Sequence, residues 1–191
     1  MANVITDATI DYVGILAKLE LTGEEKKQAK ADMGRMLDYI NKLNELDTEG
    51  VELRLGTEAH PFLIKPNLAE LEQTLGMELR TLRSIRDAAL IFLHKGVEHV
   101  VVSMGAMGAM YVGAALTLYA PAVKVEARST VGAGDAMVGG LLMGLQQGND
   151  MVQAFRCGVA AGAASVMTEG TQLIRAEDFE KLLSQVKLQE V

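Results

Sequence analysis

The stretch Ser129-Thr130-Val131-Gly132-Ala133-Gly134-Asp135-Ala136-Met137-Val138-Gly139-Gly140 decides how this chain is interpreted. Residues 123–127 before it are predicted to form a strand, and residues 136–147 after it, small and apolar, are predicted to form a helix. A glycine-rich turn therefore leads into the start of a helix. The one carboxylate of the stretch, Asp135, stands at that junction.

This turn has the chemistry of an anion site. Gly132 and Gly134 let the backbone turn tightly and let an anion come close. The free N–H groups of the first helical turn point at that anion, and the helix dipole favours negative charge there. We therefore predict an anion hole formed by Gly132, Ala133 and Gly134. Asp135 would repel a phosphate, but it suits a general base that takes a proton from an attacking hydroxyl.

Other glycine motifs fit this turn less well. A Walker loop needs Lys and then Ser or Thr after its last glycine, where Asp135 and Ala136 stand instead. A dinucleotide fingerprint needs a third glycine where Met137 stands. A plain strand-to-helix turn remains open as an alternative, because a bare Gly-x-Gly-Asp does not distinguish it from an anion site.

Taken whole, the stretch resembles the signature of the ribokinase-like (PfkB) sugar kinases, and two upstream motifs agree with it. Residues 64–70, Ile-Lys-Pro-Asn-Leu-Ala-Glu, are similar to that family's Lys-Pro-Asn-x-x-Glu. Residues 102–109 are similar to its Ser-x-Gly-x-x-Gly. The resemblance runs from about residue 53 to the C-terminus, and it is greatest to the 1-phosphofructokinase branch, with tagatose-6-phosphate kinases as near neighbours.

The resemblance implies the C-terminal, nucleotide-binding part of a layered α/β fold with a mostly parallel sheet. The implied reaction is the ATP-dependent phosphorylation of fructose 1-phosphate to fructose 1,6-bisphosphate, with Mg²⁺ as cofactor and Asp135 as catalytic base. The implied nucleotide-binding residues are Lys65, Asn67, Ser103, Gly105, Gly108 and Thr130.

Each of these residues also has an ordinary structural interpretation. Asn67 and Glu70 lie one helical turn apart and could hold Mg²⁺, mostly through water, or Asn67 could simply cap a helix. The segment from Ser103 to Gly108 could be a tight hairpin turn. Lys65 could simply end a strand and Thr130 cap a turn. The three histidines have no ligand spacing, so we predict no histidine metal site.

The alternation of elements through residues 53–191 agrees with an α/β fold. Predicted strands cover residues 62–65, 97–103 and 110–112, and a short junction covers residues 53–60. Asn67, Thr81 and either Asn149 or Asp150 are predicted helix caps. The predicted helices span 68–75, 81–93, 152–166 and 177–186.

Residues 1–52 have a different character and are predicted to form a helical hairpin. Asp7 could cap the first helix, and the capping box Thr22-Gly23-Glu24-Glu25 starts the second. Residues 12–21 and 37–52 resemble the N-terminal helices of GatC, the small non-catalytic subunit of the Asp/Glu-tRNA amidotransferase. That resemblance implies the large amidotransferase subunits as partners, although the extended tail expected after these helices is missing.

Composition limits the remaining classes. Net charge is −7 and 49% of the residues are apolar, which favours a packed core and argues against direct nucleic-acid binding. Residues 100–123 carry no charge, but glycines interrupt them, so we predict no membrane span. A lone Cys157 in an apolar segment predicts a buried thiol, and with no signal peptide apparent we expect a cytoplasmic protein.

The resemblance also implies something that this chain does not contain. A PfkB kinase should have an N-terminal half with the first strands and the sugar-binding lid, whereas here the GatC-like segment precedes residue 53. We therefore expect a bare sheet edge, which a homodimer would cover, and weak or no kinase activity from this chain alone. A chimeric chain without a selected function is a third hypothesis.

Overall fold

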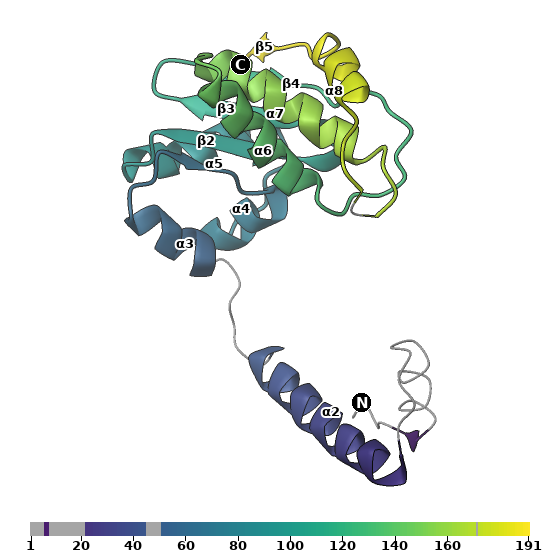
Figure 1. The fold of residues 1–191 in the computed structure, drawn as a ribbon. Helices are drawn as coiled ribbons and strands as arrows, with labels where there is room; N and C mark the ends of the chain where they lie inside the picture. Colours follow the sequence, from purple (N-terminus) through teal and green to yellow (C-terminus); the bar gives the residue numbers. More distant parts are fainter. Residues whose placement is uncertain (1–5, 8–21, 45–50, 171) are drawn as a thin grey trace. The chain divides into compact units, whose positions relative to one another are not determined.

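The computed structural model describes residues 6–7, 22–44, 51–170 and 172–191, and the chain divides into two compact units (Figure 1). Unit 1 is Met1–Thr48 and unit 2 is Glu49–Val191. The division falls four residues before the boundary predicted between residues 52 and 53.

Unit 1 contains helix α2 (Gly23–Asn44), which begins where its cap predicts. The Thr22 N–H donates to Glu25 Oε2 at 2.8 Å, and the Glu25 N–H donates to Thr22 Oγ1 at 3.4 Å, so the capping box is confirmed. Asp7 pairs with Lys30 of this helix at 2.5 Å. The first predicted helix of the hairpin lies outside the described residues.

Unit 2 is built on a mixed sheet in the order β1-β2-β3-β4-β5. The strands are β1 (Leu63–Ile64), β2 (His99–Ser103), β3 (Ala109–Gly113), β4 (Thr117–Ala120) and β5 (Gln189–Glu190). Only β1 and β2 run parallel, and the other three pairs are antiparallel. The predicted mostly parallel direction is therefore wrong, because tight turns join β2, β3 and β4 and leave no room for a crossover.

Helices cover both faces of this sheet, which confirms the ribokinase-like α/β layering (Figure 1). One face carries α3 (Val51–Glu58), α4 (Leu68–Leu75) and α5 (Leu82–His94). The other carries α6 (Ala133–Gln146), α7 (Met151–Ser165) and α8 (Ala176–Leu183). In the described residues no helix is long and apolar enough to cross a bilayer.

The central strands contribute to two apolar cores because they are buried on both faces. Val100, Val102, Met110 and Val112 pack with α4 and α5, whereas Val101 and Tyr111 pack with α6 and α7. The predicted caps of α4, α5 and α7 are confirmed as Asn67, Thr81 and Asp150. Cys157 is buried and unpaired, as predicted, and burial raises the pKa of its thiol.

Two local predictions are wrong. Residues 53–60 were expected to be a junction, but most of them belong to helix α3, where the buried Thr57 hydroxyl donates to the Leu53 carbonyl at 2.7 Å. Residues 123–127 are not a strand. Val123 and Val125 do pack against the core, but in the described residues no strand pairs with this segment, so it remains an extended loop.

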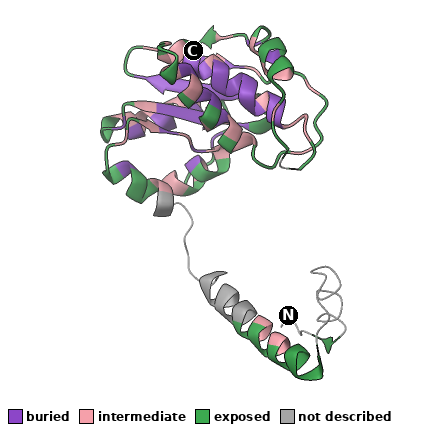
Figure 2. Ribbon diagram, in the orientation of Figure 1, coloured by how far each residue is buried: buried purple, intermediate pink, exposed green. Residues whose placement is uncertain are grey.

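Helices α6 and α7 lie unusually close because glycines stand at their contact. A Cβ built on Gly140 would lie 2.6 Å from the Cys157 carbonyl oxygen, and one on Gly158 would lie 2.7 Å from Leu141 Cγ. Gly144 meets the backbone of Ala154 in the same way, at 2.8 Å. These contacts fix how α6 sits beside α7, the most continuously buried helix of the unit (Figure 2).

The neighbouring glycines Gly139 and Gly140 therefore give a matched pair of variants. We expect Gly140→Ala to destabilise unit 2 by roughly 1–3 kcal/mol, because the new methyl group meets backbone atoms of α7. Gly139→Ala, whose added Cβ has nothing within 4 Å, should stabilise the helix by about 0.5–1 kcal/mol. Urea unfolding measures both, and equal effects would contradict this packing.

An aromatic row crosses the sheet near the start of β2. The rings of Phe62 and His99 meet edge to face at 4.8 Å, and Tyr111 lies 5.8 Å from His99 and 5.9 Å from Phe155 between ring centroids. The Tyr111 hydroxyl and His99 Nδ1 are 3.0 Å apart. Burial lowers the pKa of His99, and the nearby Glu98 only partly opposes it.

Stability should consequently depend on the pH through His99. Because its folded pKa is lowered, the unfolded chain binds more protons below about pH 6.5, so stability is retained above that pH and falls as the pH drops below it. We expect His99→Gln to reduce the loss of urea resistance between pH 7 and pH 5.5. His94→Gln, at an exposed position of α5, is the control and should leave the slope unchanged.

Candidate active site

The signature turn forms the start of α6, which begins at Ala133, three residues earlier than predicted. Gly132 is its N-cap and has a φ of 78°, a left-handed conformation that favours glycine. The Ala133 N–H donates to the Thr130 carbonyl at 3.3 Å, and the Ala136 N–H donates to the Gly132 carbonyl at 2.8 Å. In the described part of the chain, the N–H groups of Gly134 and Asp135 have no acceptor.

The loop before this turn is held against the end of α7. The N–H groups of Arg128 and Ser129 both donate to the Val166 carbonyl, at 2.7 Å and 3.2 Å. The Ser129 hydroxyl in turn accepts from the Val131 N–H at 3.2 Å. The turn is thus fixed by the helix layer, while Gly132 and Thr130 at its tip stay exposed.

Lys65 brings a positive charge to the first turn of α6. Its Nζ lies 3.3 Å from the position that a Cβ on Gly134 would occupy. Lys65 is half-buried, and among the described residues no carboxylate forms an ion pair with it. An ammonium group and free helix N–H groups therefore meet at one point, and both favour an anion there.

Asp135, the predicted base, is the third residue of α6 and is exposed. No described lysine, arginine or histidine lies within ion-pair distance of its carboxylate. The predicted turn is thus open at its tip, and its acid is neither buried nor neutralised by a partner. The carboxylate is therefore open to a hydroxyl that approaches from solvent.

Asn67 and Glu70 form a reciprocal capping box at the start of α4. The Glu70 N–H donates to Asn67 Oδ1 at 2.9 Å, and the Asn67 N–H donates to Glu70 Oε2 at 2.8 Å. Asn67 therefore caps the helix, as its structural interpretation predicts, and Glu70 completes the capping box. Glu70 keeps a second carboxylate oxygen, and in the described residues no cluster of three acidic, histidine or cysteine side chains could hold a metal ion.

The segment from Ser103 to Gly108 begins directly beside Asn67. Asn67 and Ser103 form a parallel bridge, and the Ser103 N–H donates to the Pro66 carbonyl at 3.0 Å. Beyond Ser103 the chain makes the hairpin turn between β2 and β3, closed by the Met104 N–H donating to the Gly108 carbonyl at 2.8 Å. The predicted residues Lys65, Asn67 and Ser103 therefore gather at the carboxyl ends of β1 and β2.

Gly105 and Gly108 of this turn have different structural roles. Gly108 has a φ of 96°, and a Cβ on it would lie 2.0 Å from the Ala120 carbonyl oxygen, so the fold itself requires a glycine there. Gly105 has a φ of 56° and open space around it. Only Gly105 therefore leaves its backbone accessible to a ligand.

Substitution of each glycine by alanine separates these two roles. We expect Gly108→Ala to lower the midpoint of thermal unfolding strongly, because the methyl group collides with the backbone of β4 and strains φ as well. Gly105→Ala should cost only about 1–2 kcal/mol, the penalty for the left-handed conformation. Differential scanning calorimetry compares the two, and a milder effect at residue 108 than at residue 105 would contradict the assignment.

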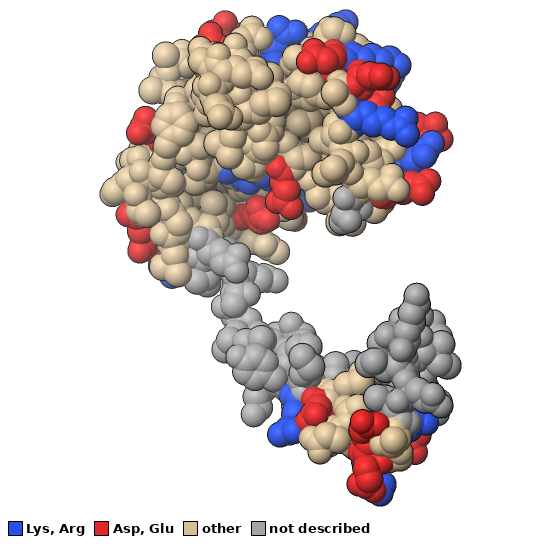
Figure 3. All heavy atoms as spheres, in the orientation of Figure 1, with Lys and Arg blue, Asp and Glu red and all other residues tan. Residues whose placement is uncertain are grey.

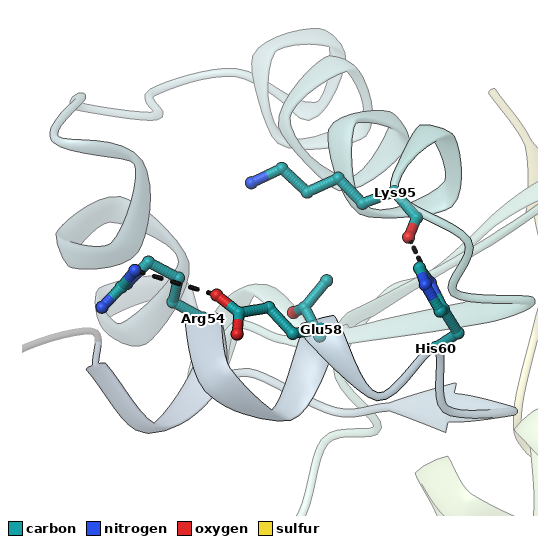
Figure 4. Close-up of a pocket in the computed structure, with 5 residues that line it drawn as sticks. Arg54, Glu58, His60 and Lys95 are labelled. Carbon is teal, nitrogen blue, oxygen red and sulfur yellow. Dashed lines mark hydrogen bonds and ion pairs between the residues drawn. The ribbon is translucent and has the colours of Figure 1, made fainter.

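A cavity of about 480 Å³ lies elsewhere on unit 2, between α3 and the end of α5 (Figure 4). Its lining comprises Arg54, Thr57, Glu58, His60 and Lys95. Arg54 Nη1 and Glu58 Oε1 are 3.8 Å apart, and His60 Nδ1 lies 2.7 Å from the Lys95 carbonyl oxygen. It contains none of the predicted site residues, so we base no part of the candidate site on this cavity.

The family model of the pfkB carbohydrate kinases matches residues 20–178, and the chain belongs to that family. The match begins inside the segment whose resemblance to GatC is a separate prediction. Family membership agrees with the geometry above, in which Lys65 lies against the first turn of α6 and Asn67 bridges to Ser103.

Two curated relatives within this family are named 1-phosphofructokinase. The chain is 37% identical to the 1-phosphofructokinase of Vibrio cholerae over 152 residues, covering 80% of this chain and 48% of that protein. It is 35% identical to the 1-phosphofructokinase of Escherichia coli K12 over 143 residues, covering 75% and 46%. The chain thus spans about half the length of the curated relatives it matches.

Solved structures agree with this family. Phosphofructokinase-2 from Escherichia coli, in complex with substrates and products, superposes with a TM-score of 0.61 at 35% identity, covering 65% of this chain and 40% of that one. Ribokinase from Thermotoga maritima superposes with a TM-score of 0.57 at 30% identity, covering 64% of this chain and 42% of that one. These likenesses confirm the ribokinase-like fold of the matched part.

Two features of the site were not foreseen from the sequence. The free donors include the N–H of Asp135 itself, since α6 starts earlier than predicted and the Ala133 N–H is used within the turn. The approach of Lys65 to Gly134 joins positions about seventy residues apart, which no local spacing shows. Little in the sequence signals the early start, because Gly132 caps α6 without a side-chain hydrogen bond.

Proposed function

We propose that unit 2 is the nucleotide- and phosphate-binding part of a 1-phosphofructokinase, which phosphorylates fructose 1-phosphate to fructose 1,6-bisphosphate with ATP. One observation carries the proposal: the Lys65 ammonium lies against the first turn of α6, where free N–H groups and Asp135 stand together. The relatives named 1-phosphofructokinase support the choice of sugar phosphate.

In the proposed reaction Asp135 accepts the proton of the attacking sugar hydroxyl. As that O–H bond breaks, the oxygen bonds to the terminal phosphorus of ATP, and the bond from phosphorus to the bridging oxygen breaks to leave ADP. The N–H groups of Gly134 and Asp135 donate to the transferred phosphoryl oxygens, with Gly132 and Ala133 shaping the turn around them. Lys65 offsets the charge that these oxygens carry.

The remaining predicted residues would hold the nucleotide and its metal. Ser103 bridges to Asn67, Thr130 belongs to the turn before α6, and Gly105 leaves its backbone open to a ligand. The free oxygen of Glu70 and the amide of Asn67 fit contact with Mg²⁺ through water, but not a site made by the protein alone. Mg²⁺ bound with ATP would neutralise phosphate charge during transfer.

We further propose that this chain turns over weakly or not at all by itself. It spans about half the length of its 1-phosphofructokinase relatives, and no predicted sugar-contact residue lies within it. Holding both reactants in line contributes several kcal/mol to such a reaction, about 7–11 in well-oriented cases. A polypeptide that binds only the phosphate donor forgoes that contribution.

Isothermal titration with Mg-ATP, together with three variants, tests this proposal. We expect Lys65→Met to weaken binding by about tenfold or more, the loss of one charge-assisted hydrogen bond. Asp135→Asn should bind at least as well as the unchanged chain, since it removes a negative charge beside the phosphates. Asp178→Asn, an acidic residue in the first turn of α8, is the matched control and should behave like the unchanged chain.

The outcomes separate the two parts of the proposal. If the unchanged chain does not bind Mg-ATP, or if Lys65→Met binds equally well, the nucleotide site is wrongly assigned. Ordinary turnover with fructose 1-phosphate in a coupled assay would contradict the proposed weakness of the isolated chain.

A second role is proposed for residues 1–52, as an accessory segment of a tRNA-dependent amidotransferase. Its support is the GatC resemblance together with a compact unit 1 whose helix α2 starts at the Thr22 capping box. Co-purification with the two large amidotransferase subunits tests this role, and Asp135→Ala should leave that assembly untouched. Sequencing the genomic junction around Glu52 and Leu53 tests the hypothesis of a chimeric chain.

A further inference from the structure

The cavity between α3 and the end of α5 lies at the other end of the strands from the candidate active site (Figure 4). His60 of its lining precedes β1, and Lys95 precedes β2, so the cavity borders the amino ends of these two parallel strands. Lys65 and Ser103 stand at the carboxyl ends of the same strands. The two places are therefore separate, and a ligand in one does not occupy the other.

His60 ties the two walls of the cavity together. Its Nδ1 lies 2.7 Å from the Lys95 carbonyl oxygen, and its ring packs so closely on Gly96 that a Cβ there would lie 2.3 Å from Nδ1. Among the described residues, His60 is the one non-glycine residue with a positive φ, 48°. Such a conformation is uncommon and persists where the surrounding contacts impose it. The cavity is therefore formed by the fold itself.

The contact with Lys95 also decides what His60 offers to a ligand. A carbonyl oxygen only accepts, so in the neutral imidazole Nδ1 carries the hydrogen. Nε2 is then an acceptor, and within the described ranges it has no hydrogen-bond partner. The side chain is exposed at the cavity that it lines. His60 is thus suited to accept a hydrogen bond from a hydroxyl group of a ligand.

Two cationic side chains line the cavity without a strong partner. Lys95 Nζ lies 5.8 Å from the centroid of the Phe92 ring, and no carboxylate of the described residues forms an ion pair with it. Arg54 lies 3.8 Å from Glu58, too far for a hydrogen bond, and such an exposed pair contributes little. On the face of unit 2 that Figure 3 shows, lysine and arginine side chains mostly lie beside acidic ones. The cavity instead has two fixed positive charges against one carboxylate.

We propose that this cavity binds a small phosphate monoester that also carries hydroxyl groups. Arg54 and Lys95, from opposite walls, donate to the phosphate oxygens, and His60 Nε2 accepts from a hydroxyl. A phosphate monoester carries about 1.5 to 2 negative charges at neutral pH, which suits two cations better than a single carboxylate does. The volume of about 480 Å³ is ordinary for a small-molecule site.

Thr57 forms the buried base of the cavity. It is 3% exposed, and its hydroxyl donates to the Leu53 carbonyl at 2.7 Å, so the hydroxyl hydrogen is already used. The base therefore adds no donor, and the phosphate group belongs between Arg54 and Lys95. Binding there is noncovalent and uses no residue of the nucleotide site.

Glu58 gives the proposal a prediction of opposite sign. Its carboxylate lies beside Arg54 and repels an anion that approaches the same guanidinium. Glu58→Gln should therefore tighten binding several-fold, whereas Arg54→Met and Lys95→Met should each weaken it by about tenfold or more, since each removes a charge-assisted hydrogen bond. Substitutions that merely disturbed the local structure would all weaken binding.

A proton NMR titration tests the inference through the Cε1–H signals of the three histidines, His60, His94 and His99. Glycerol 3-phosphate is the probe, added at constant ionic strength, and His60→Gln assigns the signal of His60. We expect that signal to shift saturably and more than the other two. Glycerol, which has hydroxyls but no phosphate, should leave it in place, and malate, a hydroxylated dicarboxylate, should bind more weakly.

Two variants are matched controls. Arg83→Met removes an arginine of α5 that lies 3.9 Å from Asp87, in the same i,i+4 relation as the pair in the cavity but outside its lining. Lys65→Met removes the cation beside the first turn of α6. Both variants should leave the response of His60 to glycerol 3-phosphate unchanged.

The result does not depend on Mg-ATP binding or on turnover, so the proposed function stands or falls separately. The absence of a saturable His60 shift, or an equal response to glycerol or malate, overturns the inference. Unchanged affinity in Arg54→Met and Lys95→Met overturns it as well, and so does weaker binding in Glu58→Gln. A response that Lys65→Met abolishes assigns the probe to the start of α6 and also overturns it.

Discussion

The close contact between α6 and α7 is the constraint on which the candidate site depends. Gly140, Gly144 and Gly158 let the two helices approach until each helix meets the other's backbone or branch-point atoms. Because α7 also contacts the sheet through Phe155 and Tyr111, this contact fixes the position of α6 against the rest of unit 2. A shift of α6 by one residue would move its free N–H groups away from Lys65 and separate the charge from the donors.

Glycine serves two purposes in this molecule, and the geometry separates them. At Gly108 and Gly140 the absent side chain makes room for other protein atoms, so these positions belong to the fold. At Gly105 and Gly132 the backbone is left-handed and faces open space, which suits contact with a ligand. The glycine motifs of the sequence are thus a mixture of packing positions and exposed backbone, and only coordinates distinguish them.

Local chemistry could be predicted from the sequence, whereas long-range arrangement could not. The caps Asn67, Thr81 and Asp150 were predictable because a side chain that satisfies helix N–H groups acts within three residues of itself. The direction of the sheet and the fate of residues 123–127 depend on which strand lies alongside, and that partner is remote in sequence. The start of α6 was missed because its cap, Gly132, has no side chain to announce it.

The Lys65 ammonium and the amino end of α6 have the same sign, and Asp135 in the first turn forms no ion pair with Lys65. These two positive ends repel each other, and a negatively charged group that enters between them relieves that repulsion. Simple oxyanions such as sulfate or inorganic phosphate should therefore raise the melting temperature of unit 2, by linkage, even where no reaction follows. The protein is in this sense a folded scaffold whose electrostatic balance is completed by its ligand.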